Sequence, residues 1–444
     1  MTLDDLRAYI VVLNGGTGCI FQPMDTAYTY ILTAKHVIQK ARGKVNVLKR
    51  FLLVDDHWKS IDIIFELQMD LNYFEHPDRD AAILKIDRLD KLDNMIRTDA
   101  ILDDRDGYIL AGYPKTRRKP TKDPGFTDSY RTDEHVTIQG RKSAGLYEAK
   151  VPGNPSLEEI QGDSGGAIVK IRNGYFYLAG IQCQMVDAKE EQLGGTEFSP
   201  MASFDQIVSA NPTLLSELLP GYMNCFSFLK ENAFILDVGA LDEENIALTR
   251  SVLRDKTTVL IKDKTTPLFI KNFFKQRILL DKQYKEVLNS RELWVAWLEF
   301  LIILNVVKYD VFGEKELAEI FDSFRLLFTK TEQDWTHEIP NMIYSDYKGL
   351  KNKGLVIIGS PLPPAGRTYE IQPGQIPRLD RVNLQKDRMK TDEGISFPFD
   401  HFRFIHLDYF KRKCITDKLD EYSQLVEEDK LLLKLKDEYA KFFV

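Results

Sequence analysis

The pattern of apolar and polar positions changes once along the chain, near Asn211-Pro212. Before this point, short apolar runs such as Tyr30–Thr33 and Ala81–Ile86 are separated by polar residues with glycine and proline, as in β-strands joined by turns. After it, apolar residues recur at spacings of three and four, which predicts amphipathic helices. We therefore expect an all-β domain over residues 1–210 and a mainly helical domain over residues 211–444.

The C-terminal half contains the longest apolar stretch, Leu293–Val307. It is too short to span a bilayer and includes Glu299 and Asn305, so we expect a buried helix there and no membrane association. The pattern also predicts an amphipathic helix over Glu314–Phe328, a short strand over Leu355–Gly359, a surface loop over Ser360–Arg381 and a charged helix over Thr416–Phe443.

The composition of the chain narrows the classes of protein to which it can belong. A chain of 444 residues with 43% hydrophobic residues is long enough for two or three domains with packed cores. Its net charge of −7 argues against direct nucleic-acid binding, and the basic cluster Lys115–Lys119 is expected in a solvated loop. Only four cysteines are present, so we expect no disulfide framework and a reducing, cytoplasmic compartment. No Cys/His spacing indicates zinc, and we expect no metal or other cofactor.

Candidate chemistry is concentrated in the run Gly162-Asp163-Ser164-Gly165-Gly166. A serine between small residues is typical of a turn that exposes a nucleophile, although the run alone also fits an ordinary surface turn. Glycine at position 162 allows the backbone N–H groups of Gly162 and Ser164 to point at one site, where they would form an oxyanion hole. We expect Gly165 and Gly166 to leave room for a substrate backbone.

A serine hydroxyl needs a base to become a good nucleophile, and two upstream residues are suitably placed. His36 follows the apolar run that ends at Thr33, and Asp80 directly precedes the apolar run that begins at Ala81. An imidazole can accept and return a proton at neutral pH, and a carboxylate can hold it in one tautomer. The rival residues are His57 and His76, with His76 expected in a solvated loop, and the flanking Asp78 and Asp87, neither of which precedes an apolar run.

These residues occur in the order His, Asp, Ser and resemble the catalytic triad of trypsin-like serine proteases with the chymotrypsin fold, of the intracellular bacterial type. The segments that carry the resemblance are Gly16–Phe21, Tyr30–Val37, Tyr108–Pro114, Gly162–Gly166 and Tyr177–Ile181. The resemblance implies a double six-stranded β-barrel over residues 1–210. It also implies peptide-bond hydrolysis with His36 as base, Asp80 as its orienting partner and Ser164 as nucleophile.

In this family the residue six positions before the nucleophile forms the floor of the specificity pocket, which is Glu158 here. A carboxylate at that position would favour cleavage after arginine or lysine. The alternative is that Leu157–Glu159 is a solvated loop in a slightly different alignment.

The sequence also departs from the secreted members of the family. Val37 follows His36 where those members have cysteine, and the chain begins Met1-Thr2-Leu3 with neither a signal peptide nor an activation sequence. In the secreted members, the aspartate at the position of Asp163 pairs with the new N-terminus of the activated precursor. Asp163 therefore needs another partner, or the oxyanion turn is assembled only on demand. We therefore expect that a non-covalent event completes the active site.

The C-terminal half resembles the C-terminal domains of effectors in bacterial ABC-three-component defence systems. The segments concerned are Glu292–Phe300, Asp334-Trp335 and Gly349–Gly354. This resemblance implies a regulated protease acting against phage or plasmids, with an SMC-like ABC ATPase or another sensor NTPase as partner. The alternatives are a non-catalytic scaffold that retains a protease fold and a housekeeping quality-control protease.

Overall fold

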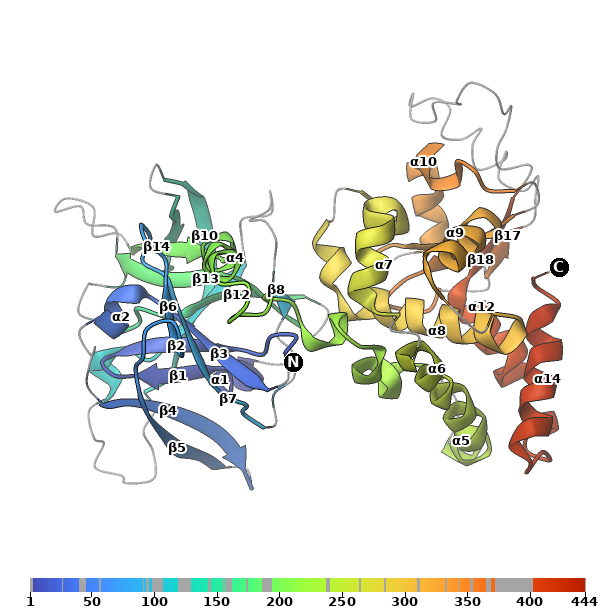
Figure 1. Ribbon diagram of the computed structural model, residues 1–444, viewed down its shortest axis with the longest axis horizontal. Coiled ribbons are helices and arrows are strands. Elements are labelled where there is room, and N and C mark those ends of the chain that lie inside the picture. Colours follow the sequence, from blue (N-terminus) through green and yellow to red (C-terminus); the bar gives the residue numbers. More distant parts are fainter. Residues whose placement is uncertain are drawn as a thin grey trace. The chain divides into compact units, whose positions relative to one another are not determined.

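The computed structural model divides into two compact units, Met1–Gly221 and Tyr222–Val444, shown in Figure 1 and described separately below. The residues described are 3–25, 27–39, 45–55, 57–90, 92, 96–97, 107–118, 129–142, 145–153, 155, 162–172, 175–185, 194–236, 240–262, 265–282, 285–309, 312–331, 334–342, 344–351, 354–364, 369–371 and 402–443.

The first part of unit 1 is a seven-stranded sheet with the order β5-β4-β1-β2-β3-β7-β6, in which neighbouring strands are antiparallel. Its central strands β2 and β3 are almost entirely buried, and their polar residues are threonines. The strands are β1 (Ile10–Leu13), β2 (Gly16–Phe21), β3 (Tyr28–Thr33), β4 (Val45–Val54), β5 (His57–Glu66), β6 (Tyr73–Glu75) and β7 (Ala82–Asp87), with the short helices α1 (Leu3–Arg7) and α2 (Lys35–Gln39).

The second part of unit 1 is a closed barrel. Its strands follow the order β12-β9-β10-β11-β14-β13, and β12 also pairs with β13, so that six strands form a ring without a free edge. The elements are β8 (Ile96–Arg97, paired with β13), β9 (Tyr108–Gly112), η1 (Lys115–Arg118), β10 (Arg131–Arg141), β11 (Tyr147–Lys150), β12 (Ala167–Arg172), β13 (Tyr175–Met185), β14 (Gly195–Pro200) and α4 (Met201–Ala210). The predicted trypsin-like fold is thus confirmed, as one closed six-stranded barrel and one half-barrel.

The two sheets of unit 1 share one hydrophobic core. Ile31 and Leu84 of the half-barrel belong to the same cluster of buried side chains as Ala111 and Leu178 of the closed barrel. Burial of apolar surface therefore sets the position of one sheet against the other.

Unit 2 combines helices with a four-stranded sheet of order β15-β16-β18-β17. Strands β15, β16 and β18 are parallel, and β17 is antiparallel to β18. The strands are β15 (Phe324–Phe328), β16 (Leu355–Gly359), β17 (Glu370–Ile371) and β18 (Arg403–His406). The α-helices are α5 (Ala240–Asp255), α6 (Thr257–Lys262), α7 (Pro267–Phe274), α8 (Arg291–Val307), α9 (Glu314–Ser323), α10 (Tyr344–Tyr347), α12 (Leu407–Cys414), α13 (Leu419–Tyr422) and α14 (Glu428–Ala440). Short 3-10 helices are η2 (Gly221–Met223), η3 (Phe226–Asn232), η4 (Lys275–Ile278), η5 (Lys285–Asn289), η6 (Trp335–Asn341) and η9 (Thr416–Lys418).

The buried helix predicted from the longest apolar stretch is confirmed as α8. The side chain of Ser290 caps it by accepting a hydrogen bond from the Leu293 N–H, and most of its residues are buried. Across the described part of the chain, no helix combines the length and apolar character that crossing a membrane requires.

The prediction of one helix over Glu314–Phe328 is wrong at its C-terminal end. Helix α9 ends at Ser323, and Phe324–Phe328 forms strand β15, which pairs with β16 in parallel. A short apolar run suits a buried parallel strand as well as a helix, and periodicity does not separate the two. The strand predicted over Leu355–Gly359 is confirmed as β16.

Two further predictions change in detail. The tail expected as one helix over Thr416–Phe443 consists of η9, α13 and α14, with a break between Tyr422 and Glu428. The loop expected over Ser360–Arg381 contains strand β17, and residues 365–368 and 372–381 lie outside the described residues.

A buried ionic cluster joins α8 to α12. Lys411 Nζ lies 3.2 Å from Glu299 Oε2 and 2.5 Å from Asp408 Oδ1. Glu299 is 2% exposed and also accepts a hydrogen bond from the backbone N–H of Phe234. Burial opposes the charge of Lys411, but the attraction of Glu299 and Asp408 outweighs it and raises the pKa of the ammonium group. The cluster is therefore held together by a lysine that stays charged at neutral pH.

Replacement of Lys411 by methionine should destabilise unit 2 strongly, because it leaves the buried Glu299 and the half-buried Asp408 without their counter-charge. We expect the free energy of unfolding to fall by about 3–5 kcal/mol in urea denaturation followed by tryptophan fluorescence. The matched control is Lys430→Met, which removes an exposed ion pair with Glu427 and should cost less than about 1 kcal/mol. Equal small losses in both variants would contradict this account of the cluster.

Candidate active site

The turn that carries Ser164 depends on glycine in two places. Gly162 and Gly165 have φ angles of 101° and 93°, in the left-handed region that side chains disfavour. The Gly166 N–H closes the turn by donating to the Asp163 C=O at 2.6 Å. Ser164 itself is half-buried at the centre of this turn.

The two glycines after Ser164 make room for the chain's own backbone. A Cβ atom built on Gly165 would lie 1.7 Å from the carbonyl oxygen of Thr17 in β2. One built on Gly166 would lie 2.7 Å from the carbonyl oxygen of Ala111 in β9. The prediction that these glycines leave space for a substrate backbone is therefore wrong, because both spaces are filled from within unit 1.

Asp163 is 1% exposed, and its carboxylate lies against β9. A Cβ atom on Gly112 would lie 2.6 Å from Asp163 Oδ1, so glycine at position 112 permits this close packing. The residue before Ser164 is thus enclosed by the closed barrel.

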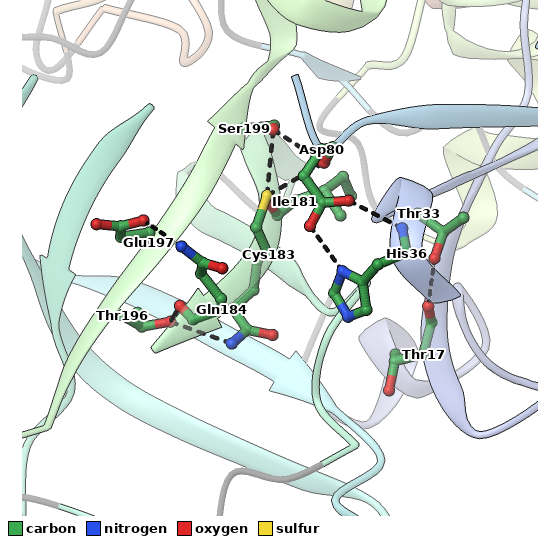
Figure 2. A network of polar contacts seen from close by, with 11 residues as sticks. Thr17, Thr33, His36, Asp80, Ile181, Cys183, Gln184, Thr196, Glu197 and Ser199 are labelled. Carbon is green, nitrogen blue, oxygen red and sulfur yellow. Dashed lines mark hydrogen bonds and ion pairs between the residues drawn. The ribbon is translucent and has the colours of Figure 1, made fainter. Parts of the chain in front are cut away.

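His36 and Asp80 lie together, as predicted. Strands β3 and β7 are antiparallel with Thr33 opposite Ala82, so the residues just after β3 and just before β7 are neighbours. Asp80 Oδ2 lies 2.7 Å from His36 Nδ1, and Asp80 Oδ1 accepts the backbone N–H of His36 at 2.9 Å (Figure 2). A carboxylate at Nδ1 favours the tautomer with its proton there, which leaves Nε2 free to accept a proton. The pair is therefore arranged as a base with an orienting partner.

The backbone of Asp80 is held from the closed barrel. Its carbonyl oxygen lies 3.2 Å from Cys183 Sγ in β13 and 3.1 Å from Ser199 Oγ in β14, and these two side chains lie 3.1 Å apart (Figure 2). Both donors are buried. The two sheets therefore hold Asp80 jointly: its carboxylate bonds to the half-barrel and its carbonyl to the closed barrel.

The rival histidines are placed differently. His76 was expected to be solvated, but it is 6% exposed, and its Nε2 lies 2.7 Å from Gln206 Oε1. Its Nδ1 accepts the backbone N–H groups of Asp78 and Arg79, which fixes the loop that leads to Asp80. His57 lies exposed on β5.

Unit 2 contains a second grouping of serine, histidine and aspartate that the sequence analysis missed. Ser360 Oγ lies 2.9 Å from His406 Nε2, and Asp408 Oδ2 lies 3.5 Å from His406 Nδ1. However, Nδ1 accepts the backbone N–H of Asp408 at the start of α12, so Nε2 carries the proton and donates to Ser360. The Ser360 hydroxyl in turn donates to the Leu362 carbonyl at 2.6 Å.

This second grouping is suited to structure rather than to catalysis. His406 is 1% exposed, and burial lowers its pKa to about 4, which keeps the ring neutral. With its proton on Nε2, the ring has no lone pair facing Ser360. The group joins the end of β16 to α12 by hydrogen bonds.

The remaining site predictions concern Glu158 and metal binding. Glu158 lies outside the described residues. Among the residues that the structure describes, no set of three His, Cys, Asp or Glu side chains is placed to hold a metal ion.

The four cysteines are free thiols, and they should differ sharply in reactivity. Burial, with a smaller contribution from the charge of Asp80, raises the pKa of Cys183 to about 12, and burial raises the pKa of Cys414 to about 12. Cys19 is also buried and its pKa is raised further, whereas Cys225 is half-buried. At pH 8, iodoacetamide should therefore modify Cys225 first in the folded chain and all four thiols in urea, as measured by peptide mass spectrometry. Modification of Cys183 as fast as Cys225 would contradict the closed packing beside Asp80.

Comparison with known proteins agrees with this architecture. The family model described as Trypsin matches residues 11–202. The model described as C-terminal domain 4 of the ABC-three component (ABC-3C) systems matches residues 198–416. No curated protein matches the chain.

Among solved structures, an inactive mutant form of Rv3671c from M. tuberculosis H37Rv is 14% identical with a TM-score of 0.32, covering 48% of this chain and 92% of its own. The active form of the Rv3671c protease from M. tuberculosis is 15% identical with a TM-score of 0.32, covering 48% of this chain and 86% of its own. Scores this low establish nothing further about this chain. The chain therefore combines an N-terminal region that matches the Trypsin family with a C-terminal region that matches C-terminal domain 4 of the ABC-three component systems.

Proposed function

We propose that this chain is a serine endopeptidase in which His36, Asp80 and Ser164 form the catalytic triad. The observation that carries this proposal is the pair of hydrogen bonds that the Asp80 carboxylate accepts from His36, one from the ring Nδ1 and one from the backbone N–H. In the same unit, the turn that carries Ser164 is bonded directly to β2.

In this mechanism Ser164 Oγ attacks the carbonyl carbon of the peptide bond while His36 Nε2 takes the hydroxyl proton. The oxyanion of the tetrahedral intermediate accepts hydrogen bonds from the N–H groups of Gly162 and Ser164. His36 then gives its proton to the leaving amine, and an acyl-enzyme remains on Ser164. Water, activated by His36 in the same way, hydrolyses the ester. Asp80 stabilises the imidazolium ion that forms in both steps.

Glu158 is proposed as the floor of the specificity pocket, with cleavage after arginine or lysine. Support comes from β13, which runs beside the nucleophile turn: Gln182 exchanges backbone hydrogen bonds with Gly165 and Gly166. The side chain of Gln182 is 1% exposed and donates to Thr196 Oγ1. Its amide oxygen has no hydrogen-bond partner among the described residues.

The C-terminal domain suggests the setting in which the protease acts. We infer that unit 2 binds another component of an ABC-three-component system, an SMC-like ABC ATPase or another sensor NTPase, in the bacterial cytoplasm. The support is the family model that matches residues 198–416. The protease would then be an effector of defence against phage or plasmids, and the bound component would control access of protein substrates to Ser164.

A fluorophosphonate probe tests the triad on the full chain with its proposed ABC-three-component partner present. The probe should label the wild-type chain on Ser164 and should not label Ser164→Ala. In a separate assay, the rate of peptide hydrolysis should fall by about three orders of magnitude or more in His36→Ala and in Asp80→Asn. The matched control is Ser360→Ala, since Ser360 also lies beside a histidine but accepts a hydrogen bond from the ring instead of donating one to it. Labelling that survives Ser164→Ala or disappears in Ser360→Ala would contradict the assignment.

Reporter peptides with arginine, lysine, leucine or glutamate before the cut bond test the specificity. We expect kcat/KM to be at least about 10-fold higher for arginine and lysine, because a charge-assisted hydrogen bond in a poorly hydrated pocket discriminates at this level. Glu158→Gln should reduce this preference, whereas Glu159→Gln should leave it unchanged. A preference for leucine or glutamate would overturn the proposal for Glu158 and leave the triad untouched.

A further inference from the structure

One buried residue of the half-barrel contacts both sides of the nucleophile turn. Thr17 in β2 is 0% exposed. Its backbone N–H donates to the carbonyl of Ser164 at 2.8 Å, and its hydroxyl donates to the carbonyl of Gly162 at 2.9 Å. A single threonine thus binds the residues before and after Asp163.

The direction of each hydrogen bond is determined by its partners. The Thr17 hydroxyl oxygen accepts the backbone N–H of Tyr113 at 3.1 Å, and a backbone N–H can only donate. The carbonyl of Gly162 can only accept, so it receives the hydroxyl proton. Both partners of the hydroxyl are therefore main-chain groups of the closed barrel and its turn.

The carbonyl of Thr17 extends the connection to the histidine. It accepts a hydrogen bond from Thr33 Oγ1 at 2.7 Å, and Thr33 ends β3 just before His36 (Figure 2). A continuous path of short hydrogen bonds therefore runs from the turn of Ser164 through Thr17 to the segment that carries the base.

Steric contact with β2 also restricts the movement of the turn that carries Ser164, on the side where Thr17 binds it. A Cβ atom on Gly16 would lie 2.9 Å from the carbonyl oxygen of Ser164. The turn already packs so closely on β2 that Gly165 must also lack a side chain, as described above. The turn cannot move closer to β2, and the hydrogen bonds of Thr17 oppose its moving away.

We propose that Thr17 is a positioning residue for the oxyanion hole. The carbonyls that it binds, those of Gly162 and Ser164, flank the peptide group that carries the Ser164 N–H. Because Gly162 has no side chain, its backbone dihedral angles are weakly restricted. The hydrogen bond from the Thr17 hydroxyl to the Gly162 carbonyl holds this backbone in one conformation. The inference rests on the proposed triad and adds that the anchor of the turn lies within the chain, so that the partner expected to complete the site need not build this turn.

Thr17→Val tests this in the full chain. Valine keeps the shape of threonine and the backbone bond to Ser164 but loses both bonds of the hydroxyl. With a reporter peptide, we expect kcat to fall about 10- to 100-fold with KM within about 3-fold, because an oxyanion donor that is displaced acts mainly in the transition state. The affinity for a peptide boronate should fall by the same factor as kcat/KM. Thr17→Ser should restore kcat to within about 3-fold of the wild type.

The matched control is Thr29→Val. Thr29 is also buried, and its hydroxyl donates to Gln22 and accepts from the Leu89 N–H, away from the turn. We expect its kcat and KM to equal those of the wild type. If Thr17→Val does not fold, Thr17→Cys, which keeps a weaker donor, should show a kcat below that of Thr17→Ser at equal KM.

Two results would overturn the role of Thr17: an unchanged kcat in the variant that lacks the donor, or failure of serine to restore it. Absence of peptide hydrolysis and of fluorophosphonate labelling in the wild-type chain with its proposed ABC-three-component partner present would instead count against the triad, so the two proposals fail in different ways. A variant that raises KM and lowers boronate affinity equally, with no change in kcat, would show that Thr17 acts only on substrate binding.

Discussion

The active-site proposal depends on the contact between β2 and the turn that carries Ser164. Ser164 belongs to the closed barrel, whereas His36 lies in helix α2, directly after strand β3 of the half-barrel. The shared hydrophobic core brings the two sheets together, but apolar packing is not directional. Thr17 donates hydrogen bonds to the turn and accepts one from Thr33, and these bonds supply the direction that this packing lacks.

A second set of contacts serves the same purpose on the side of Asp80. Cys183 and Ser199 donate to its carbonyl from β13 and β14, while its carboxylate bonds to His36. These contacts and those of Thr17 lie on different strands and share no residue. Each connects a different member of the proposed triad to the opposite sheet, so that displacement of one sheet against the other would disturb the proposed site at two points.

The sequence was sufficient to find the residues of chemical interest but not what holds them. His36 and Asp80 could be paired because each stands at the end of an apolar run, and antiparallel neighbours bring such ends together. The role of Thr17 could not be predicted, because it depends on contacts with residues more than a hundred positions away that only the packing of two sheets creates. His76 was misjudged for the same reason: its loop is polar, yet α4 of the same unit covers its ring through Gln206.

The second grouping of Ser360, His406 and Asp408 shows why residue types alone do not identify a catalytic site. Its distances resemble those of a triad, but a backbone N–H occupies the nitrogen that the aspartate would need to orient. At His36 the corresponding nitrogen faces Asp80, and the backbone N–H bonds to the other carboxylate oxygen.

The most direct measurement of the central claim is a crystal structure of the full chain with a peptide boronic acid. The account predicts a bond from Ser164 Oγ to boron, one boronate oxygen about 3 Å from the N–H nitrogens of Gly162 and Ser164, and His36 Nε2 within hydrogen-bond reach of the adduct. Boron bound to another residue, or bound to Ser164 with its oxygens turned away from both N–H groups, would contradict it.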